Sequence, residues 1–258
     1  MKVLCLTLAI ACLVMTFPFV AASIDDASLV LYFPFNEGTG NKVNDYSGKQ
    51  NNGIVNGTKW VDGKYGKALS FGGDDAYVEV DKYIPLDNRP FTLEAWVYRA
   101  KDQKESWDMI ISQIDTLSQN KGLHFGMRRD NEGAVATFAF YSNDLNSTGP
   151  IAKEQWYHIA GVYTGKKQQL FINGKLDIER DAAPYAGVKG NIFIGTRPEM
   201  EGQPGVHGLQ FDGIIDEVAI YQKELTKAEI NADMNIIKPL AVFPSGKLAT
   251  TWGDMKHY

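Results

Sequence analysis

The chain has 258 residues, of which 44% are hydrophobic and 22% are charged, with 25 glycines and 10 prolines. This ordinary globular composition excludes collagen, low-complexity disorder and small disulfide-rich proteins. The formal net charge is −5, and the sequence contains no basic block. Because binding to phosphates needs clustered lysine and arginine, the charge argues against a nucleic-acid partner.

The N-terminal 22 residues have the pattern of a secretory signal peptide. Lys2 precedes an apolar stretch over 3–20, which leads into a run of small residues. We expect cleavage after Ala22 or Ser23, which gives an exported mature chain that is secreted, extracellular or periplasmic. An uncleaved membrane anchor and a lipoprotein modified at Cys12 are the alternatives. No second segment is long and apolar enough to span a membrane, so we expect no membrane span in the mature chain.

Both cysteines, Cys5 and Cys12, lie inside this leader. The mature chain is therefore expected to have no disulfide, no catalytic thiol and no cysteine-based zinc site. Its stability must come from its core and from any metal that it binds.

Short alternating or apolar runs, separated by Gly, Asn and Asp, predict an all-β protein. Asn173-Gly174 is a strong signal for a tight hairpin turn. So many short strands imply a two-sheet antiparallel sandwich. The predicted strands cover 29–35, 68–71, 77–80, 91–98, 109–114, 123–128, 135–141, 156–163, 168–172, 175–178, 191–195 and 211–221.

One helix is predicted near the C-terminus. Thr226 is followed three residues later by Glu229, which is the pattern of a capping box, and the helix should run to about Met234. We expect one domain over 28–237 and a C-terminal tail over 238–258. The tail is interpreted as disordered, with a docking segment or an added strand as the alternative.

Four stretches follow one another in a distinctive order. They are YFPFNEGTG at 32–40 with DYSG and NNG after it, GKYGKALSFGGDDAYVEV at 63–80, FTLEAWV at 91–97 with the later WYHIAGV and LFINGK, and FDGIIDEVAIYQKEL at 211–225. Together they resemble the laminin G-like, concanavalin A-like jelly-roll domains of secreted bacterial proteins. The resemblance implies the jelly-roll fold and says less about function, because lectins, carbohydrate modules, adhesion domains and a few enzymes share it.

The resemblance also implies a structural Ca²⁺ ion at the sandwich edge, which would be bound by oxygen ligands. Asp216 is the most informative position, because a carboxylate among apolar neighbours needs a metal, an arginine or backbone N–H groups as its partner. Asn36 departs from the Asp that many relatives have. A solvated turn and a strand end are the plainer interpretations of the other positions. The predicted ligands are Asn36, Glu37, Gly73, Asp74, Asp75 and Asp216.

Carbohydrate binding is the second hypothesis. Trp107 follows a polar run and is predicted to lie on a loop, where its ring could stack on a sugar. Arg128 with Arg129, Asn143 with Asp144, and Arg197 lie at predicted strand ends or in loops and could meet on one rim. The alternative is that they are solvated surface residues or members of local ion pairs. Other tryptophans in strand positions, Trp60, Trp96 and Trp156, are interpreted as packing residues.

No catalytic residues are predicted. A glycosidase needs two neighbouring carboxylates, which two acidic residues at positions i and i+2 of one strand would provide. Glu79 and Asp81 have this spacing, but they lie at a predicted strand end beside a turn, where solvated carboxylates are common. Asp216 and Glu217 are adjacent, so on a regular strand they would point to opposite faces. His158 is interpreted as a packed histidine.

The sequence thus favours a non-catalytic extracellular recognition module with a structural calcium, whose partner is a glycan or a cell-surface protein. One alternative is a structural or adhesion protein of the cell envelope that has no specific sugar ligand. A glycoside-active enzyme is the other alternative.

Overall fold

Sixteen strands and one helix form within the residues that the computed structural model describes, which are 26–72, 75–100, 107–116, 118–130, 133–198 and 209–235. Sheet A comprises β1 (Leu29–Phe33), β4 (Lys59–Asp62), β5 (Lys67–Phe71), β7 (Phe91–Arg99), β12 (Trp156–Tyr163), β13 (Lys167–Ile172), β14 (Lys175–Asp181) and β16 (Gly213–Tyr221). Sheet B comprises β2 (Lys42–Val43), β3 (Gly53–Asn56), β6 (Tyr77–Val80), β8 (Trp107–Gln113), β9 (Leu123–Asp130), β10 (Gly133–Phe140), β11 (Asp144–Pro150) and β15 (Ile192–Ile194).

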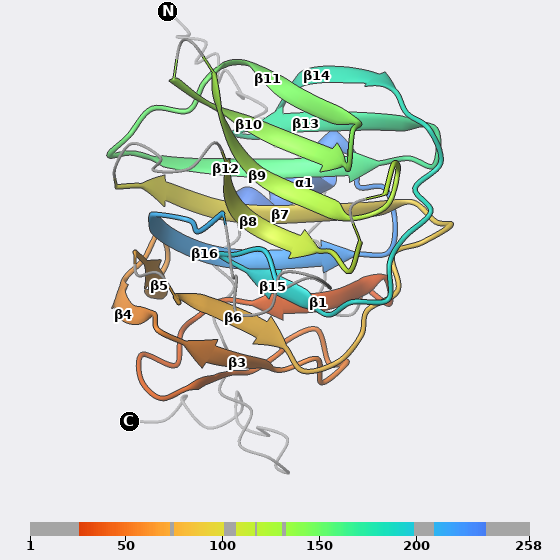
Figure 1. The fold of residues 1–258 in the computed structure, drawn as a ribbon. Helices are drawn as coiled ribbons and strands as arrows, with labels where there is room; N and C mark the ends of the chain where they lie inside the picture. The colour runs from red at the N-terminus through yellow and green to blue at the C-terminus, as the bar shows by residue number, and fades with distance from the viewer. Residues whose placement is uncertain are drawn as a thin grey trace, which may run out of the picture.

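The two sheets lie face to face as two layers, with sheet B toward the viewer in Figure 1. The strand order is β14-β13-β12-β7-β16-β5-β4 in sheet A, with β1 against β16, and β11-β10-β9-β8-β15-β6-β3-β2 in sheet B. Chain neighbours such as β5 and β6 lie in different sheets, so the chain crosses between the layers. The predicted two-sheet antiparallel sandwich is confirmed.

The core between the sheets is rich in aromatic rings, because alternate residues of each strand point inward. Phe91 of β7 lies in this core, with its ring centroid 6.0 Å from that of Phe138 and 5.9 Å from that of Phe140. Both partners belong to β10 of sheet B, so these contacts join the two layers. The strand that the sequence predicts over 91–98 is confirmed as β7, and Phe91, Leu93, Ala95 and Val97 all lie in the core.

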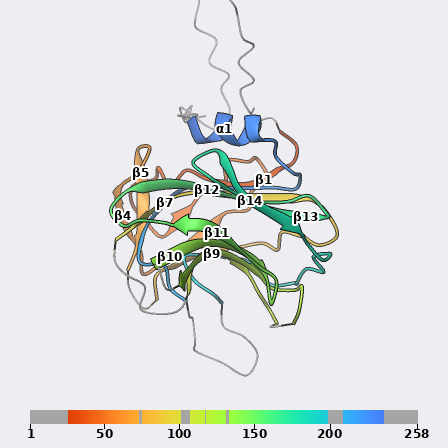
Figure 2. The ribbon, with the colours of Figure 1, turned by 90° about the horizontal axis from the view of Figure 1, so that it is seen from above.

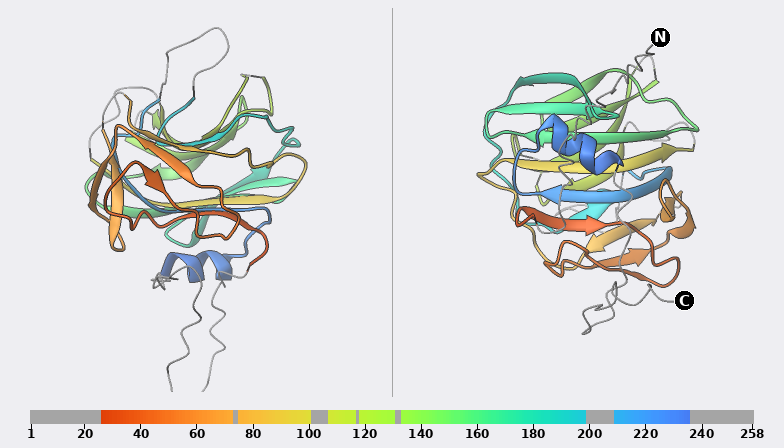
Figure 3. Two further views of the ribbon diagram at one scale, coloured as in Figure 1. Left: turned by 90° about the horizontal axis from the view of Figure 1, so that it is seen from below. Right: turned by 180° about the vertical axis from the view of Figure 1, so that it is seen from behind.

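Helix α1 (Lys227–Asn235) lies against the outer face of sheet A (Figures 2 and 3). The Glu229 N–H donates to Thr226 Oγ1 over 3.3 Å, and the Thr226 N–H donates to Glu229 Oε2 over 2.7 Å. This is the capping box that the sequence predicts. Ile230 packs into a second apolar cluster with Leu225 and Tyr221, so sheet A is covered on both faces.

A tight turn at Asn173 and Gly174 joins β13 to β14, as predicted. Both residues have positive φ, 49° and 71°, as the two central residues of a type I′ turn must have. His158 is also packed as predicted, with only 3% of its surface exposed. In the described part of the chain, no helix has the length and apolar character needed to cross a membrane. The predicted leader and the tail over 238–258 lie outside the described residues.

A β-bulge in β16 corrects one expectation. The pairing of β16 with β7 shifts between Asp216 and Ala219, and Glu217 has a φ of 51°. Ile215 and Val218 both point into the core, so the two carboxylates between them share the opposite face. The prediction that Asp216 and Glu217 point to opposite faces is therefore wrong, because a bulge adds a residue and interrupts the alternation.

Candidate functional site

The outer face of sheet B carries a hollow of about 390 Å³, which we call the sheet hollow. Side chains from β8, β9 and the β10–β11 turn form it together with Arg197 and Leu209. Its lining residues are Trp107, His124, Tyr141, Ser142, Asp144, Arg197 and Leu209.

Strand register places these side chains on one face. Leu123, Phe125 and Met127 of β9 point into the core, so the residues between and beyond them point outward. His124 therefore faces outward from β9. On β10, Ala139 is paired with His124 on one side and with Asp144 on the other. Because the alanine methyl group is small, it leaves room between the imidazole and the carboxylate.

Three aromatic rings line the hollow. The Trp107 ring centroid lies 5.7 Å from that of His124, which in turn lies 6.3 Å from that of Tyr141. Arg128 stands opposite Trp107 in the β8–β9 register, and its guanidinium carbon lies 5.6 Å from the Trp107 ring centroid. Its Nη1 donates to Asp144 Oδ2 over 3.0 Å. Rings, a carboxylate and a guanidinium are thus presented together.

Burial sets the charge states at this surface. His124 is 7% exposed, and desolvation lowers its pKa to about 4, so the imidazole is neutral at pH 7. Its Nδ1 lies 3.1 Å from the Gly122 carbonyl oxygen, which can only accept, so Nδ1 carries the proton. Burial also lowers the pKa of Arg197. The hollow therefore offers both hydrogen-bond donors and acceptors.

Three of the four residues predicted to bind a ligand come together here. Trp107 and Arg197 line the sheet hollow, and Arg128 borders it. The prediction that Trp107 lies on a loop is wrong, because it is the first residue of β8 and pairs with Arg128 of β9. Asn143 is next to two lining residues, but its amide donates to Asn120 over 3.3 Å and accepts from Arg180. It therefore lies beside the hollow rather than in its lining.

Asp144, which was grouped with Asn143 from the sequence, also lines the hollow. Four lining residues were not singled out from the sequence as ligand-binding residues: His124, Tyr141, Ser142 and Leu209. A signal for His124 was available, because it has the same parity on β9 as Arg128. Tyr141 and Asp144 lie at the two ends of the β10–β11 turn, and their position depends on a strand that the sequence did not predict.

Asp216, the central predicted calcium ligand, is fully buried and has backbone N–H groups as partners. Its Oδ2 accepts the N–H of Tyr65 over 3.0 Å, and its Oδ1 accepts the N–H of Glu217 over 2.9 Å. Burial raises the pKa of Asp216 to about 8, although these hydrogen bonds act in the opposite direction. The sequence allows a metal, an arginine or backbone N–H groups as the partner of the Asp216 carboxylate. Among the described residues, the partners are backbone N–H groups.

Asn36 and Glu37 follow β1 and contact two different segments. Asn36 Oδ1 accepts the N–H of Lys67 over 2.8 Å. Glu37 Oε1 accepts the N–H of Asn44 over 2.8 Å, whereas its Oε2 is buried and has no hydrogen-bond partner among the described residues. Oxygens of the type that Ca²⁺ prefers are present, but most of them already accept a hydrogen bond.

Asp75 is exposed, and its backbone lies against Gly57. Gly73 and Asp74 fall outside the described residues. Within the described ranges, no three His, Cys, Asp or Glu side chains converge as a metal site would require. The predicted ligands therefore do not form a cluster in the part that can be described, and calcium binding stays a prediction from the sequence.

A family model for the concanavalin A-like lectin/glucanases superfamily matches residues 71–231. The chain belongs to this superfamily. The laminin G-like resemblance predicted from the sequence is thereby confirmed. Among curated proteins, this chain matches pappalysin-1 of Mus musculus at 22% identity over 203 residues. The match covers 74% of this chain and 12% of pappalysin-1. The chain thus spans only a small part of that relative.

Several solved structures of low sequence identity share the fold. One is domain 4 of AbnA, an extracellular arabinanase from Geobacillus stearothermophilus in complex with arabinotriose, with a TM-score of 0.64, 15% identity, and coverage of 80% of this chain and 98% of that one. Another is the binding domain of Paraclostridial Mosquitocidal Protein 1, with a TM-score of 0.62, 16% identity, and coverage of 83% and 53%. Trypanosoma rangeli sialidase matches with a TM-score of 0.59, 15% identity, and coverage of 84% and 34%.

Both binding domains and glycosidases thus share this architecture. At these identities the likeness shows the fold alone, so the function has to be argued from the residues of the chain itself.

Proposed function

We propose that this protein is an extracellular glycan-recognition module that binds sugar in the sheet hollow. The observation that carries the proposal is the grouping of the Trp107, His124 and Tyr141 rings with Asp144 and Arg197 around one hollow on an outer sheet face. Aromatic rings match the apolar face of a sugar, and charged groups hydrogen-bond to its hydroxyls. A hollow of about 390 Å³ is within the usual size range of small-ligand sites.

The acidic residues of this site support glycan binding without hydrolysis. Glycoside hydrolysis generally uses two carboxyl groups, one on each side of the scissile bond. Asp144 is the one acidic residue among the described lining residues, and it is paired with Arg128. The bound arabinotriose of the AbnA domain supports the use of this fold for glycan binding. An enzyme would instead release reducing ends from a polysaccharide, which a colorimetric assay measures directly.

The proposal is tested by probing an array of immobilised glycans with the purified protein. We expect at least one glycan class to be captured, and Trp107→Ala to weaken that capture at least about tenfold. Trp156→Ala is the matched control, because Trp156 is a partly buried tryptophan of sheet A that packs against Tyr98. The proposal fails if no glycan is captured or if Trp107→Ala binds as tightly as the unaltered protein.

If the protein is instead a structural or adhesion protein of the cell envelope without a specific sugar ligand, it should bind none of the glycans on the same array. The structural calcium remains part of the proposal as a stabilising ion, and its test is given in the Discussion.

A further inference from the structure

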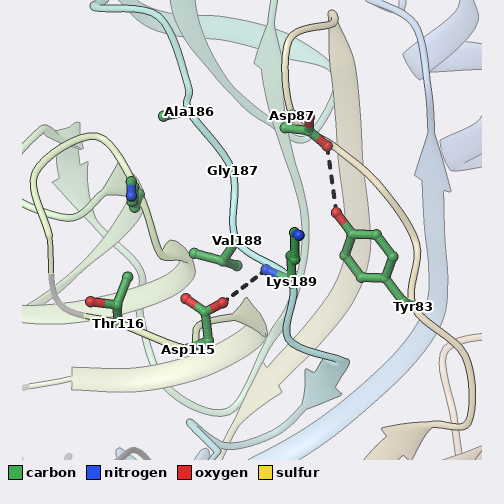
Figure 4. Close-up of a pocket in the computed structure, with 9 residues that line it drawn as sticks. Tyr83, Asp87, Asp115, Thr116, Ala186, Gly187, Val188 and Lys189 are labelled. Atoms are coloured by element: carbon green, nitrogen blue, oxygen red, sulfur yellow. Dashed lines mark hydrogen bonds between the residues drawn. The ribbon is translucent and has the colours of Figure 1, made fainter.

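A second hollow of about 610 Å³, which we call the rim pocket, is formed by connections between strands and is shown in close-up in Figure 4. Three connections form it: the one between β6 and β7, the one between β8 and β9, and the one between β14 and β15. In Figure 4 the segment 186–189 runs between Tyr83 and Asp87 on one side and Asp115 and Thr116 on the other. The lining residues are Tyr83, Asp87, Asp115, Thr116, Lys121, Ala186, Gly187, Val188 and Lys189.

The walls of the rim pocket are fixed from within the protein. Gln113 is fully buried, and its Nε2 donates to the Ile84 carbonyl over 2.8 Å and to the Gly190 carbonyl over 3.1 Å. One amide group therefore ties two of the three connections together. Gly187 has a φ of 71° and packs so closely on Asp87 that an added Cβ would clash. The pocket is thus formed before any ligand arrives, which lowers the entropic cost of binding.

The segment 186–189 of the pocket wall is anchored by the residue before it. Tyr185 is 1% exposed, and its ring packs on Phe140 in the core with centroids 4.5 Å apart. Its N–H donates to the Tyr163 hydroxyl over 3.1 Å. The core therefore holds this wall of the pocket in place.

The side chains that line the rim pocket define the ligand chemistry. Tyr83 is 41% exposed, which leaves its ring available for stacking. Asp87 and Asp115 supply acceptors, Lys121 and Lys189 supply donors, and their formal charges cancel. Asp115 is oriented by the N–H of Lys189, which donates to its Oδ2 over 2.9 Å. Mixed donors and acceptors without a net charge, beside one aromatic ring, suit a neutral compound with several hydroxyl groups.

We propose that the rim pocket is a second binding site and that it takes one residue of a neutral sugar. The proposal rests on the proposed function only for the class of ligand, because none of its residues line the sheet hollow. The turn at Asn120 lies between the two sites: its N–H donates to the Tyr141 carbonyl over 3.1 Å, and its carbonyl accepts the N–H of Ala186 over 3.0 Å. One oligosaccharide could therefore contact both sites across this turn.

The test is an NMR titration of the isotope-labelled protein, in which the backbone amide of Gly187 reports on the rim pocket and that of Gly126 on the sheet hollow. The probes are three neutral trisaccharides, namely arabinotriose, cellotriose and β-1,3-linked glucotriose, and one anionic sugar, sialyllactose. We expect at least one neutral trisaccharide to shift the Gly187 resonance in a saturable way. Sialyllactose should bind at the rim at least about tenfold more weakly, because the pocket has no excess positive charge.

One variant tests the lining of the pocket. Tyr83→Ala removes the exposed ring and should weaken rim binding at least about tenfold. Tyr98→Phe, on sheet A, is the control and should leave rim binding unchanged.

The two proposals give separable outcomes. If Trp107→Ala abolishes the shift at Gly126 but not that at Gly187, both sites are present. If a trisaccharide shifts only Gly126, the rim proposal is overturned while the proposed function stands. The rim proposal is also overturned if no neutral trisaccharide shifts Gly187, if only sialyllactose does, or if Tyr83→Ala binds as the unaltered protein does.

Discussion

Arg128 holds two groups of the sheet hollow at once, because its guanidinium lies over the ring of Trp107 and donates to the carboxylate of Asp144. The guanidinium carbon is 5.6 Å from the ring centroid, and Nη1 is 3.0 Å from Asp144 Oδ2. The Arg128 side chain is 44% exposed. At that exposure a cation–π contact contributes about 0.5–1 kcal/mol, and an ion pair about 0–1 kcal/mol.

The first prediction follows from this exposure. Arg128→Ala should lower the free energy of unfolding by no more than about 2 kcal/mol, as measured by urea denaturation. The same variant should weaken glycan capture more than it weakens the fold, because Trp107 and Asp144 both lose the group that orients them. Arg129→Ala is the control, since Arg129 is the exposed next residue on β9. A loss above about 3 kcal/mol would show that Arg128 is a structural residue of the sheet.

A second prediction concerns pH and His124. Its pKa is about 4 in the folded protein, whereas an unfolded histidine titrates near 6.5. Between these values the unfolded chain binds the proton and the folded chain does not, so stability rises with pH across this window and is lost as pH falls from about 6.5 to 4. A shift of this size corresponds to about 3 kcal/mol.

The measurement compares urea unfolding at pH 7.5 and pH 4.5 in the unaltered protein and in His124→Gln. His158 has a pKa of about 3 and contributes a loss of the same sign, so the unaltered protein should lose stability at low pH from both residues. The variant should show a smaller loss than the unaltered protein. Equal losses in the two proteins would mean that His124 is not held neutral by burial.

Most of the fold could be predicted because the buried strands have strong local signals. The Phe91–Arg99 strand alternates, the Asn173-Gly174 turn has the residues that positive φ requires, and Thr226 with Glu229 forms the predicted capping box. The strands that were missed are β2, β3, β4 and β11. Three of them have at most four residues, and β11 is polar and ends in a proline, so neither periodicity nor composition distinguished them from loops.

The candidate site could be predicted only in part, since it depends on which strands become neighbours. Trp107 and Arg128 were singled out separately, but only the register of β8 with β9 places them opposite each other. Tyr141 and Asp144 lie close together because β11 folds back on β10, and β11 was not predicted. The rim pocket depends on three connections that meet only in the folded chain. Asp216 and Glu217 were misplaced because a bulge leaves no clear trace in a single sequence.

The third prediction concerns the attachment of α1 to sheet A. Thr226→Ala removes the N-cap hydroxyl that accepts the Glu229 N–H, so it should cost about 1 kcal/mol of unfolding free energy in a urea titration. Lys227→Ala, at the next exposed position, keeps the cap and should stay within about 0.5 kcal/mol of the unaltered protein. If both variants cost the same, the cap does not hold the helix.

The last prediction is that of calcium at the sandwich edge. An ion that binds only the folded state raises stability by about 2.7 kcal/mol at a hundredfold excess over its Kd. We therefore expect millimolar calcium to raise the thermal unfolding midpoint by several degrees relative to chelator, and Asp216→Asn to lose that rise. The asparagine keeps one oxygen for the Tyr65 N–H, so the variant separates loss of charge from loss of that hydrogen bond. Asp181→Asn is the control, at an exposed carboxylate on sheet A. If the midpoint is the same with calcium and with chelator, no stabilising calcium binds, and Asp216 is a structural carboxyl group held by backbone N–H groups.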